Sequence, residues 1–553
     1  MQTTITIPHI EGNATPYVTN ILRTLAGSEE VMISFEKGTY FFHKEGCNAK
    51  EISVGYLSET VKQIIFLLEK IENLTIDGNG STFVFTDRLF PFALLNCKNI
   101  TLKNFIIDFS FCRYCQGKVL STDDKGFELA IDRNAFQYSI NEKGNVVFSS
   151  GSDGFSTADL PILIGNTVFG KAPWDYIFTG TDNLDRSCLA TTYIETDASE
   201  TEAGLYFAYR ENSRRLKLDL NDLLFFNYEP RANVNILMYE SEKITIQNVQ
   251  MYRSGGMGVV GQFSKDILID GLQVIVPEGR EDSFSLTADS MFFTHCYGDV
   301  VVRNSRVEKS IDDALNIHGF YTEVAQVNGK KAVLKEGLFS HKGTTAGYVG
   351  NLMQFYHKDT QNFAGEAVIK SINILPDKSF EMLMDRELDF VSAGDLVEND
   401  TLSANFLFEN NYLYRCPQVR VSDNGKLIVR NNIFEECIAL LIDDLIHYWR
   451  ETGCINDLTI IDNTFINTPR AGGDTGAIFI TTTRLPECTM RHKNVVIARN
   501  KFENSAKTPI QIRVEYTDNI TISDNVFACG DMNELIKIKA CNNLAVENNS
   551  IKN

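Results

Sequence analysis

Short stretches of alternating apolar and polar residues recur along most of the chain and predict β-strands. Each stretch is bounded by polar residues, as in Asn73–Asp77, Asn99–Asn104 and Lys243–Asn248. The further copies are Asp266–Asp270, Asp299–Asn304, Lys426–Asn431, Asp457–Asp462, Asn494–Asn500, Asn519–Asp524 and Asn543–Asn548. Copies that follow one another directly recur about every 20–40 residues, a spacing typical of solenoid repeats. Repeats of this length, made of short strands without helical periodicity, predict an all-β protein with the fold of a right-handed parallel β-helix.

The residues that follow each strand indicate a bend in every coil. Asn or Asp, often doubled, is followed by an aliphatic residue or Phe, as in Asn432–Phe434, Asn463–Phe465 and Asn525–Phe527. Asn tolerates a left-handed backbone and hydrogen-bonds its own chain, so it suits such a bend. We expect these side chains to stack into polar ladders along the solenoid.

Two long gaps interrupt the repeat, one between Asn99 and Lys243 and the other between Asp299 and Lys426. Both contain hairpin-like sequence, which predicts two related β-barrel-like insertions, at 112–235 and 320–402. The β-helix is then divided into an N-terminal cap with the first coils (1–111), catalytic coils (236–319) and C-terminal coils (403–553). Insertions in a solenoid usually project from one face and often wall a site. The alternative is that they serve packing or dimerisation, and a homodimer is therefore left open.

Charge and composition exclude several classes of partner. The 553 residues carry 52 basic and 72 acidic side chains, a net charge of −20, whereas nucleic acids and anionic membranes call for a basic surface.

No apolar run approaches the ~18 residues that span a bilayer. The first residues show no signal-peptide pattern. The 12 cysteines lack the spacing of a zinc site, and we expect neither a metal nor another cofactor. A neutral sugar remains a suitable ligand.

Acidic residues one coil apart are the strongest candidates for catalysis. Asp313 follows Asp289 by the length of one repeat, which places the two on adjacent coils, and Asp312 precedes Asp313. Neighbouring strands lie ~4.8 Å apart. Carboxylates this close raise the pKa of one of them, which favours a protonated acid beside an ionised partner. Glycoside hydrolysis needs such a pair, one to protonate the leaving oxygen and one to activate water or attack carbon.

Two observations weigh against this interpretation. An Asp-Asp pair after a strand also occurs simply to turn the chain, and Asp443-Asp444 offers a comparison with the same dipeptide. Strict alternation would place Asp312 and Asp313 on opposite faces unless the backbone bends there.

Further polar residues are expected along the same groove. Asn316 and His318 share a face and suit the recognition of sugar hydroxyls. Arg420, Arg513 and Glu515 lie on later coils and should point outward, because a charge inside the helix is costly; a structural ion pair is the alternative for them. Trp174 and Trp449 are the only tryptophans, and Trp174 is a candidate platform for the apolar face of a sugar.

The segments Ala288–Gly298 and Ile311–Gly319 resemble the signature of family 110 glycoside hydrolases. The resemblance implies an exo-acting, inverting α-1,3-galactosidase that removes terminal galactose from glycans such as the blood group B antigen. It further implies Asp289 as general acid, Asp312 and Asp313 in the base function, and a secreted or periplasmic location. Family members often carry His where this chain has Phe292, so His295 is the expected substitute in hydroxyl recognition.

Other activities on the same fold are left open. Polygalacturonases also place three Asp residues on adjacent coils, but their Asp pair is typically followed by Cys, whereas Ala314 follows it here. A polysaccharide lyase would pair acidic calcium ligands with a basic residue. A non-catalytic carbohydrate-binding solenoid would need no stacked acids. For an inverting hydrolase we expect the carboxyl groups to be ~6.5–9.5 Å apart, against ~5–5.5 Å for a retaining one.

Overall fold

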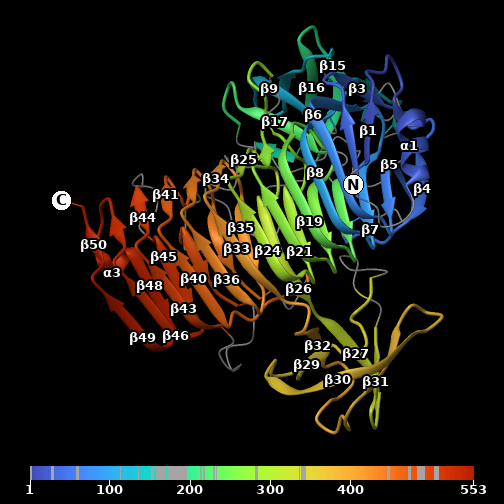
Figure 1. Cartoon of the computed structure of the whole chain (residues 1–553). Helices are drawn as coiled ribbons and strands as arrows, with labels where there is room; N and C mark the ends of the chain where they lie inside the picture. The colour runs from blue at the N-terminus through green and yellow to red at the C-terminus, as the bar shows by residue number, and fades with distance from the viewer. Residues whose placement is uncertain are drawn as a thin grey trace.

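Two long parallel sheets wind along one axis and form a β-helix (Figure 1). The computed structural model describes residues 3–25, 30–55, 57, 61–112, 114–134, 136–142, 144–150, 155–156, 169–171, 196–211, 215, 218–227, 231, 233–280, 284–335, 337, 344–444, 449–470, 475–482, 492–503 and 510–552. The predicted all-β solenoid is confirmed. No described helix is both long and apolar enough to cross a membrane.

The larger sheet has 22 strands and runs the length of the molecule. Its pairings are parallel, and from β21 onward each coil contributes a longer strand followed by a shorter one. Its strands are β1 (Thr3–Ile7), β2 (Val31–Phe35), β3 (Thr39–Phe42), β6 (Glu72–Phe85), β8 (Lys98–Phe109), β19 (Glu242–Met251), β21 (Lys265–Asp270), β22 (Gln273–Val274), β24 (Tyr297–Arg303), β25 (Arg306–Glu308), β33 (Ala404–Glu409), β34 (Tyr412–Tyr414), β36 (Lys426–Arg430), β37 (Ile433–Glu435), β40 (Asp457–Ile461), β41 (Thr464–Ile466), β43 (His492–Ala498), β44 (Lys501–Glu503), β46 (Thr517–Ser523), β47 (Val526–Phe527), β49 (Asn542–Glu547) and β50 (Ser550–Ile551).

The second sheet carries the candidate site on its outer face. Apart from the antiparallel pairs at β4–β5 and β26–β39, its strands are parallel. They are β4 (Asn48–Glu51), β5 (Val61–Glu69), β7 (Phe90–Leu95), β18 (Val234–Tyr239), β20 (Met257–Gln262), β23 (Met291–Thr294), β26 (Leu315–Phe320), β35 (Gln418–Ser422), β38 (Ala439–Ile442), β42 (Ile478–Ile480), β45 (Ile512–Glu515) and β48 (Ile536–Lys539), with β39 (Glu451–Thr452) paired to β26. The described helices are α1 (Thr15–Thr24) at the N-terminal end and α3 (Met532–Leu535) near the last coils.

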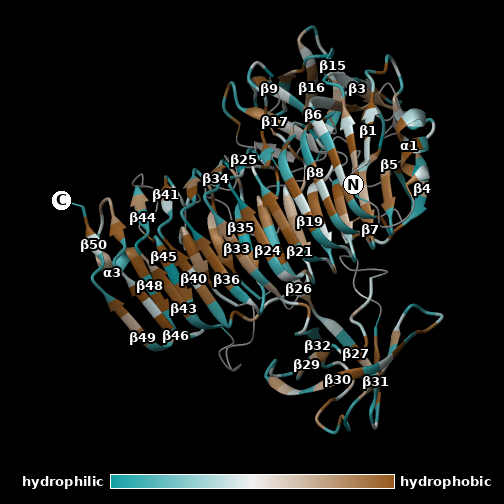
Figure 2. Cartoon of the chain, in the orientation of Figure 1, coloured by the Kyte–Doolittle hydropathy of each residue, from teal (hydrophilic) through white to brown (hydrophobic). Residues whose placement is uncertain are grey.

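Side chains alternate between the interior and the surface of the β-helix, as Figure 2 shows in the alternating colours along the strands. The interior is one continuous apolar core that runs from Ile7 to Ile536. Aromatic rings stack from coil to coil inside it; Phe465 lies 4.8 Å from Phe434 and 5.0 Å from Phe502 between ring centroids. Burial of these columns, rather than contacts within one coil, stabilises each coil.

The predicted polar ladder is present at the bend that follows the longer strands. The first residue of each doublet, such as Asp462, adopts a positive φ (58°), and the second points inward. Asn463 Nδ2 donates to Asn500 Oδ1 at 3.0 Å, and Asn432 Nδ2 donates to Asn463 Oδ1 at 3.0 Å. The ladder comprises Asn411, Asn432, Asn463, Asn500, Asn525 and Asn549.

Both interruptions of the repeat contain additional β structure, above and below the solenoid in the view of Figure 1. The first holds a six-stranded sheet, in the order β14 (Phe169–Lys171), β17 (Leu223–Asn227), β9 (Tyr114–Thr122), β10 (Gly126–Ala130), β16 (Gly204–Tyr209), β15 (Thr196–Glu200), and a three-stranded one of β11 (Tyr138–Ile140), β12 (Val146–Ser150) and β13 (Phe155–Ser156). The second is a closed barrel of β27 (Thr322–Asn328), β28 (Lys331–Leu334), β31 (Phe380–Met384), β30 (Phe363–Ile374), β29 (Leu352–Tyr356) and β32 (Leu396–Asn399). The five domain boundaries stay predictions.

Candidate active site

Adjacent coils bring the three predicted carboxylates together. β23 and β26 are paired with Phe292 opposite Asn316, and Asp289 and Asp313 continue this register just before the two strands. The Ser290 N–H donates to the Asp313 carbonyl at 2.9 Å and maintains the register. One carboxylate oxygen from each of Asp289, Asp312 and Asp313 lies within 4.8 Å of the other two. All three side chains are buried.

A bend in the backbone places Asp312 and Asp313 in the same cluster. The Asp313 N–H donates to Asp312 Oδ1 at 3.0 Å, and β26 begins only at Leu315. Because these residues precede the strand, its strict alternation does not apply to them. The Asp-Asp pair therefore both turns the chain and supplies two carboxylates to one site.

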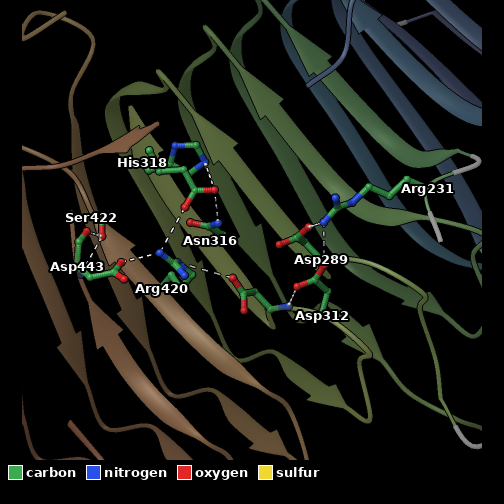
Figure 3. Close-up of polar contacts among 10 residues, drawn as sticks. Arg231, Asp289, Asp312, Asn316, His318, Arg420, Ser422 and Asp443 are labelled. Carbon is green, nitrogen blue, oxygen red and sulfur yellow. Dashed lines mark hydrogen bonds and ion pairs between the residues drawn. The ribbon is translucent and has the colours of Figure 1, made fainter. Parts of the chain in front are cut away.

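Two arginines provide positive charge from opposite sides, as Figure 3 shows. Arg231 Nη2 lies 2.8 Å from Asp312 Oδ2 and 3.8 Å from Asp289 Oδ2. Arg420 Nε lies 3.9 Å from Asp313 Oδ2. The two guanidinium groups partly offset the repulsion among three buried carboxylates, and Arg231 forms its shortest contact in the cluster with Asp312.

Burial sets the protonation of two of the carboxyl groups. Burial first and the Asp312 carboxylate second raise the pKa of Asp289 well above its usual range, with Arg231 opposing. The same two causes raise the pKa of Asp313, with Arg420 opposing. The cluster thus combines two carboxyl groups whose pKa is raised with a carboxylate paired to arginine. This combination is the one that acid–base catalysis requires.

The same three carboxylates form the only cluster of His, Cys, Asp or Glu side chains, over the part of the chain that the structure describes, that is close enough to hold a cation. Oxygen ligands of this kind suit a hard cation such as calcium or magnesium. The Arg231 guanidinium already occupies the position next to Asp312 and Asp289. We therefore assign no metal to the cluster.

The next strands continue the polar face. β26 pairs with β35 so that Asn316 is opposite Arg420 and His318 opposite Ser422. The Glu451 carboxylate lies above this row, 3.4 Å from Asn316 Nδ2, 3.4 Å from Arg420 Nη2 and 3.6 Å from His318 Nε2. Burial lowers the pKa of His318, which favours its neutral form.

Some buried polar atoms of this face have no partner among the described residues. Asp313 Oδ1 and Asn316 Oδ1 are fully buried and accept no hydrogen bond there. Such atoms are rare in folded proteins because leaving them unpaired is costly. Two unpaired acceptors within and beside the carboxylate cluster are well suited to the hydroxyl groups of a sugar.

The second Asp-Asp dipeptide, Asp443-Asp444, belongs to the site as well. Asp443 Oδ1 lies 2.6 Å from Arg420 Nη2, and burial raises the pKa of Asp443 to about 6. Asp444 Oδ1 accepts a hydrogen bond from the Tyr321 hydroxyl at 3.1 Å. Asp443 continues the row of His318 and Ser422, so the dipeptide used for comparison places a carboxylate on the same face.

The other candidate residues lie apart from the carboxylates. His295 packs against Phe320 and Phe263, with ring centroids 4.3 Å and 5.4 Å away, and burial lowers its pKa to about 3. Arg513 and Glu515 form an ion pair at 2.6 Å on β45, three strands beyond β35. Trp174 lies outside the described residues, and Trp449 is half-buried near Glu451. Substrate contacts of these residues stay predictions.

Three charged residues of the site escaped the sequence reasoning: Arg231, Asp443 and Glu451. Asp443 could have been found, because it follows Ser422 by one repeat, at the position that continues the row. Arg231 follows the first insertion, and Glu451 lies on an excursion between β38 and β42. No repeat period fixes either position.

The nearest oxygen atoms of the three carboxyl groups lie within 4.8 Å of one another. The ranges of ~6.5–9.5 Å for inverting and ~5–5.5 Å for retaining enzymes refer to whole carboxyl groups. Inversion stays a prediction.

Comparison with known proteins supplies the deciding observation. The chain is 27% identical to alpha-1,3-galactosidase B of Phocaeicola vulgatus over 83% of its own length and 77% of that protein. It is 25% identical to alpha-1,3-galactosidase B of Bacteroides thetaiotaomicron over 98% of its length and 83% of the relative, and 25% identical to alpha-1,3-galactosidase A of Shewanella woodyi over 90% and 80%. The resemblance to family 110 is confirmed.

Family models and solved structures add little to this result. No family model matches the chain. An exopolygalacturonase from Thermotoga maritima aligns over 98% of this chain and 88% of its own, with 10% identity and a TM-score of 0.45. A tailspike protein of an E. coli bacteriophage aligns over 99% and 64%, with 10% identity and a TM-score of 0.34.

Proposed function

We propose that this protein is an exo-acting α-1,3-galactosidase that removes terminal galactose from glycans such as the blood group B antigen, with inversion at the anomeric carbon. The observation that carries the proposal is the buried group of Asp289, Asp312 and Asp313, in a chain similar over most of its length to proteins of that name. A polygalacturonase, a lyase and a non-catalytic solenoid are not favoured. The substrate is neutral, which agrees with a chain of net charge −20.

The contacts of each carboxyl group suggest its role in a single displacement. Asp289, whose pKa is raised by burial, donates its proton to the glycosidic oxygen as the bond to the anomeric carbon breaks. Asp312, held beside Arg231, accepts a proton from the water that attacks that carbon from the opposite face. Asp313 and Asn316 accept hydrogen bonds from sugar hydroxyls through their unpaired oxygens. The products are free galactose and a glycan with a new hydroxyl group.

Release of galactose from α-1,3-, α-1,4- and α-1,6-linked substrates tests the proposal, with NMR to identify the first anomer formed. We expect preference for the α-1,3 linkage and β-galactose as the first product. The variants Asp289→Asn and Asp312→Asn should each lower kcat by about 10²–10⁴-fold, the usual contribution of acid–base groups. Asp313→Asn should lower kcat/KM through its contact with a sugar hydroxyl. Asp462→Asn, an exposed residue on the larger sheet, serves as the control. Wild-type activity in Asp289→Asn, or α-galactose as first product, would refute the corresponding part of the mechanism.

Location and assembly are part of the same proposal. The family resemblance supports a location in the periplasm or outside the cell, where glycans with terminal galactose occur. Fractionation of cells that produce the full-length protein, with the activity assay as readout, tests this location. The predicted homodimer is tested by sedimentation of the purified chain.

A further inference from the structure

Glu451 reaches the site from β39, a strand of two residues that lies between the solenoid and the barrel. β39 pairs antiparallel with the end of β26, with Thr452 opposite Gly319. The next residue along β26, Phe320, is opposite Glu451. A strand of two residues is not stable by itself. The position of the Glu451 carboxylate therefore also depends on the contacts of Thr452 on the side away from β26.

A buried carboxylate of the barrel holds that other side. Glu398, in β32, is 1% exposed. One of its oxygens accepts a hydrogen bond from the Thr452 hydroxyl, and the other accepts one from the Tyr356 hydroxyl at 2.5 Å. The Cys454 thiol lies 3.9 Å from the same carboxylate. A buried charge is tolerated only when such donors surround it, so Glu398 joins the barrel to the segment that carries Glu451.

We propose that Glu398 is a positioning residue for glycoside hydrolysis, which through Thr452 keeps the Glu451 carboxylate beside Asn316, His318 and Arg420. The inference rests on the proposed function and extends it, because it gives the barrel a part in the reaction. The three contacts of Glu451, at 3.4 to 3.6 Å, are already long for hydrogen bonds. A displacement of about 1 Å would break them, and misplacements of that size can cost about 100-fold in rate.

The position of Glu451 also acts on the catalytic acid. The charged and titratable groups that face Glu451 are Arg420 and His318, and Arg420 continues to Asp443 and Asp313. The negative charge of Glu451 contributes to the raised pKa of both Asp289 and Asp313. If Glu451 moves away, the pKa of Asp289 falls. The acid then loses its proton at lower pH, and the alkaline limb of the kcat/KM profile shifts to lower pH.

Substitutions at both ends of the Glu398–Thr452 contact test the inference, with galactose release measured as a function of pH. Thr452→Val keeps the shape of the side chain and removes the hydroxyl, whereas Thr452→Ser keeps the hydroxyl. Glu398→Gln removes the charge of the carboxylate. Glu381→Gln is the matched barrel control, because Glu381 pairs with Lys331 on the exposed side of the barrel.

We expect Thr452→Val and Glu398→Gln to lower kcat/KM by about tenfold or more and to shift the alkaline limb to lower pH. Thr452→Ser and Glu381→Gln should remain within about twofold of the wild type, with an unchanged profile. Wild-type activity and profile in Thr452→Val and Glu398→Gln would overturn the inference. Equal losses in Thr452→Ser and Thr452→Val would do the same, because the hydroxyl would then not be the link.

A structural measurement separates this inference from the proposed function. If the wild-type protein releases no galactose from any substrate, the proposed function fails. A crystal structure of Thr452→Val then still decides the positioning: a displaced Glu451 carboxylate supports it, and an unmoved one overturns it. If Thr452→Val does not fold, Glu398→Gln is compared with Glu381→Gln by the same two measurements.

Discussion

The carboxyl groups of this site are buried to a similar extent and differ in the charged side chains that surround them. Asp289, Asp312 and Asp313 are 4%, 8% and 5% exposed, yet Arg231 contacts Asp312 most closely and Arg420 faces Asp313. Identical side chains on adjacent coils thereby acquire different tasks. Asp443 on the far side of Arg420 extends the same network and keeps that guanidinium in place.

Arg231→Gln tests the electrostatic part of this arrangement. The positive charge of Arg231 lowers the pKa of Asp289, so its removal should raise that pKa further. The general acid then keeps its proton to higher pH, and the alkaline limb of the kcat/KM profile should move up by about one pH unit, the lower end of the effect of a neighbouring charge. The measurement is kcat/KM across the acidic and neutral pH range on an α-1,3-linked galactoside.

Arg499→Gln is the control for this prediction, because Arg499 forms an exposed ion pair with Asp462 on the larger sheet. Its profile should match that of the wild type. A profile of Arg231→Gln that also superimposes on the wild type would contradict the assigned role of Arg231. A shift to lower pH would contradict the sign of the effect on Asp289.

A site residue could be predicted from the sequence only where the repeat period fixes its position. Asp289 and Asp313 were predictable because in-register parallel coils turn a separation of one repeat into adjacency. Arg231 and Glu451 were not, because each lies where an irregular segment returns to the solenoid, and the repeat period carries no information there. The joint placement of Asp312 and Asp313 could be predicted only in part. Strict alternation along a strand would put the two side chains on opposite faces, but the backbone bends before β26 and brings both into the cluster.

Elements of the β-helix are held together at the bends by the asparagine ladder. Asn463 is fully buried; its amide donates to Asn500, Val429 and Ile461, and its oxygen accepts from Asn432. Asn was predicted at these bends for its tolerance of left-handed backbone. The structure divides the two tasks, since the first residue of each doublet takes the positive φ and the second forms the ladder.

Asn463→Ala should therefore destabilise the protein strongly. Carbonyl and amide groups of four neighbours would lose a partner inside the helix, and each unsatisfied buried group costs about 1–3 kcal/mol. We expect a loss of more than about 3 kcal/mol, measured by urea denaturation. Asn405→Ala is the control, because the exposed Asn405 donates only to Asp299 among the described contacts and should change stability by about 0.5 kcal/mol or less. Equal losses in the two variants would contradict the ladder as a source of stability.

Across the whole molecule, the two insertions meet the solenoid at the same few coils. Arg231 enters the site at the return from the first insertion, and Glu398 of the barrel accepts a hydrogen bond from Thr452, the neighbour of Glu451. The solenoid supplies the carboxylates in register, and the additional modules supply or support charges that no coil could place. The proposed catalytic centre is thus an assembly of three parts of the chain.

Stability along the solenoid should depend on having a neighbouring coil on both sides. Ile520 and Leu544 occupy the same interior column on successive strands, but Ile520 is 1% exposed and Leu544 is 43% exposed. In a solenoid each coil is stabilised mainly by its neighbours.

Ile520→Ala should therefore cost about 2–5 kcal/mol, as for a fully buried aliphatic residue. Leu544→Ala should cost about 1 kcal/mol or less, because its side chain is already partly in water. Thermal and urea unfolding of both variants measure the difference, and similar costs would show that the last described coil is packed as tightly as those before it.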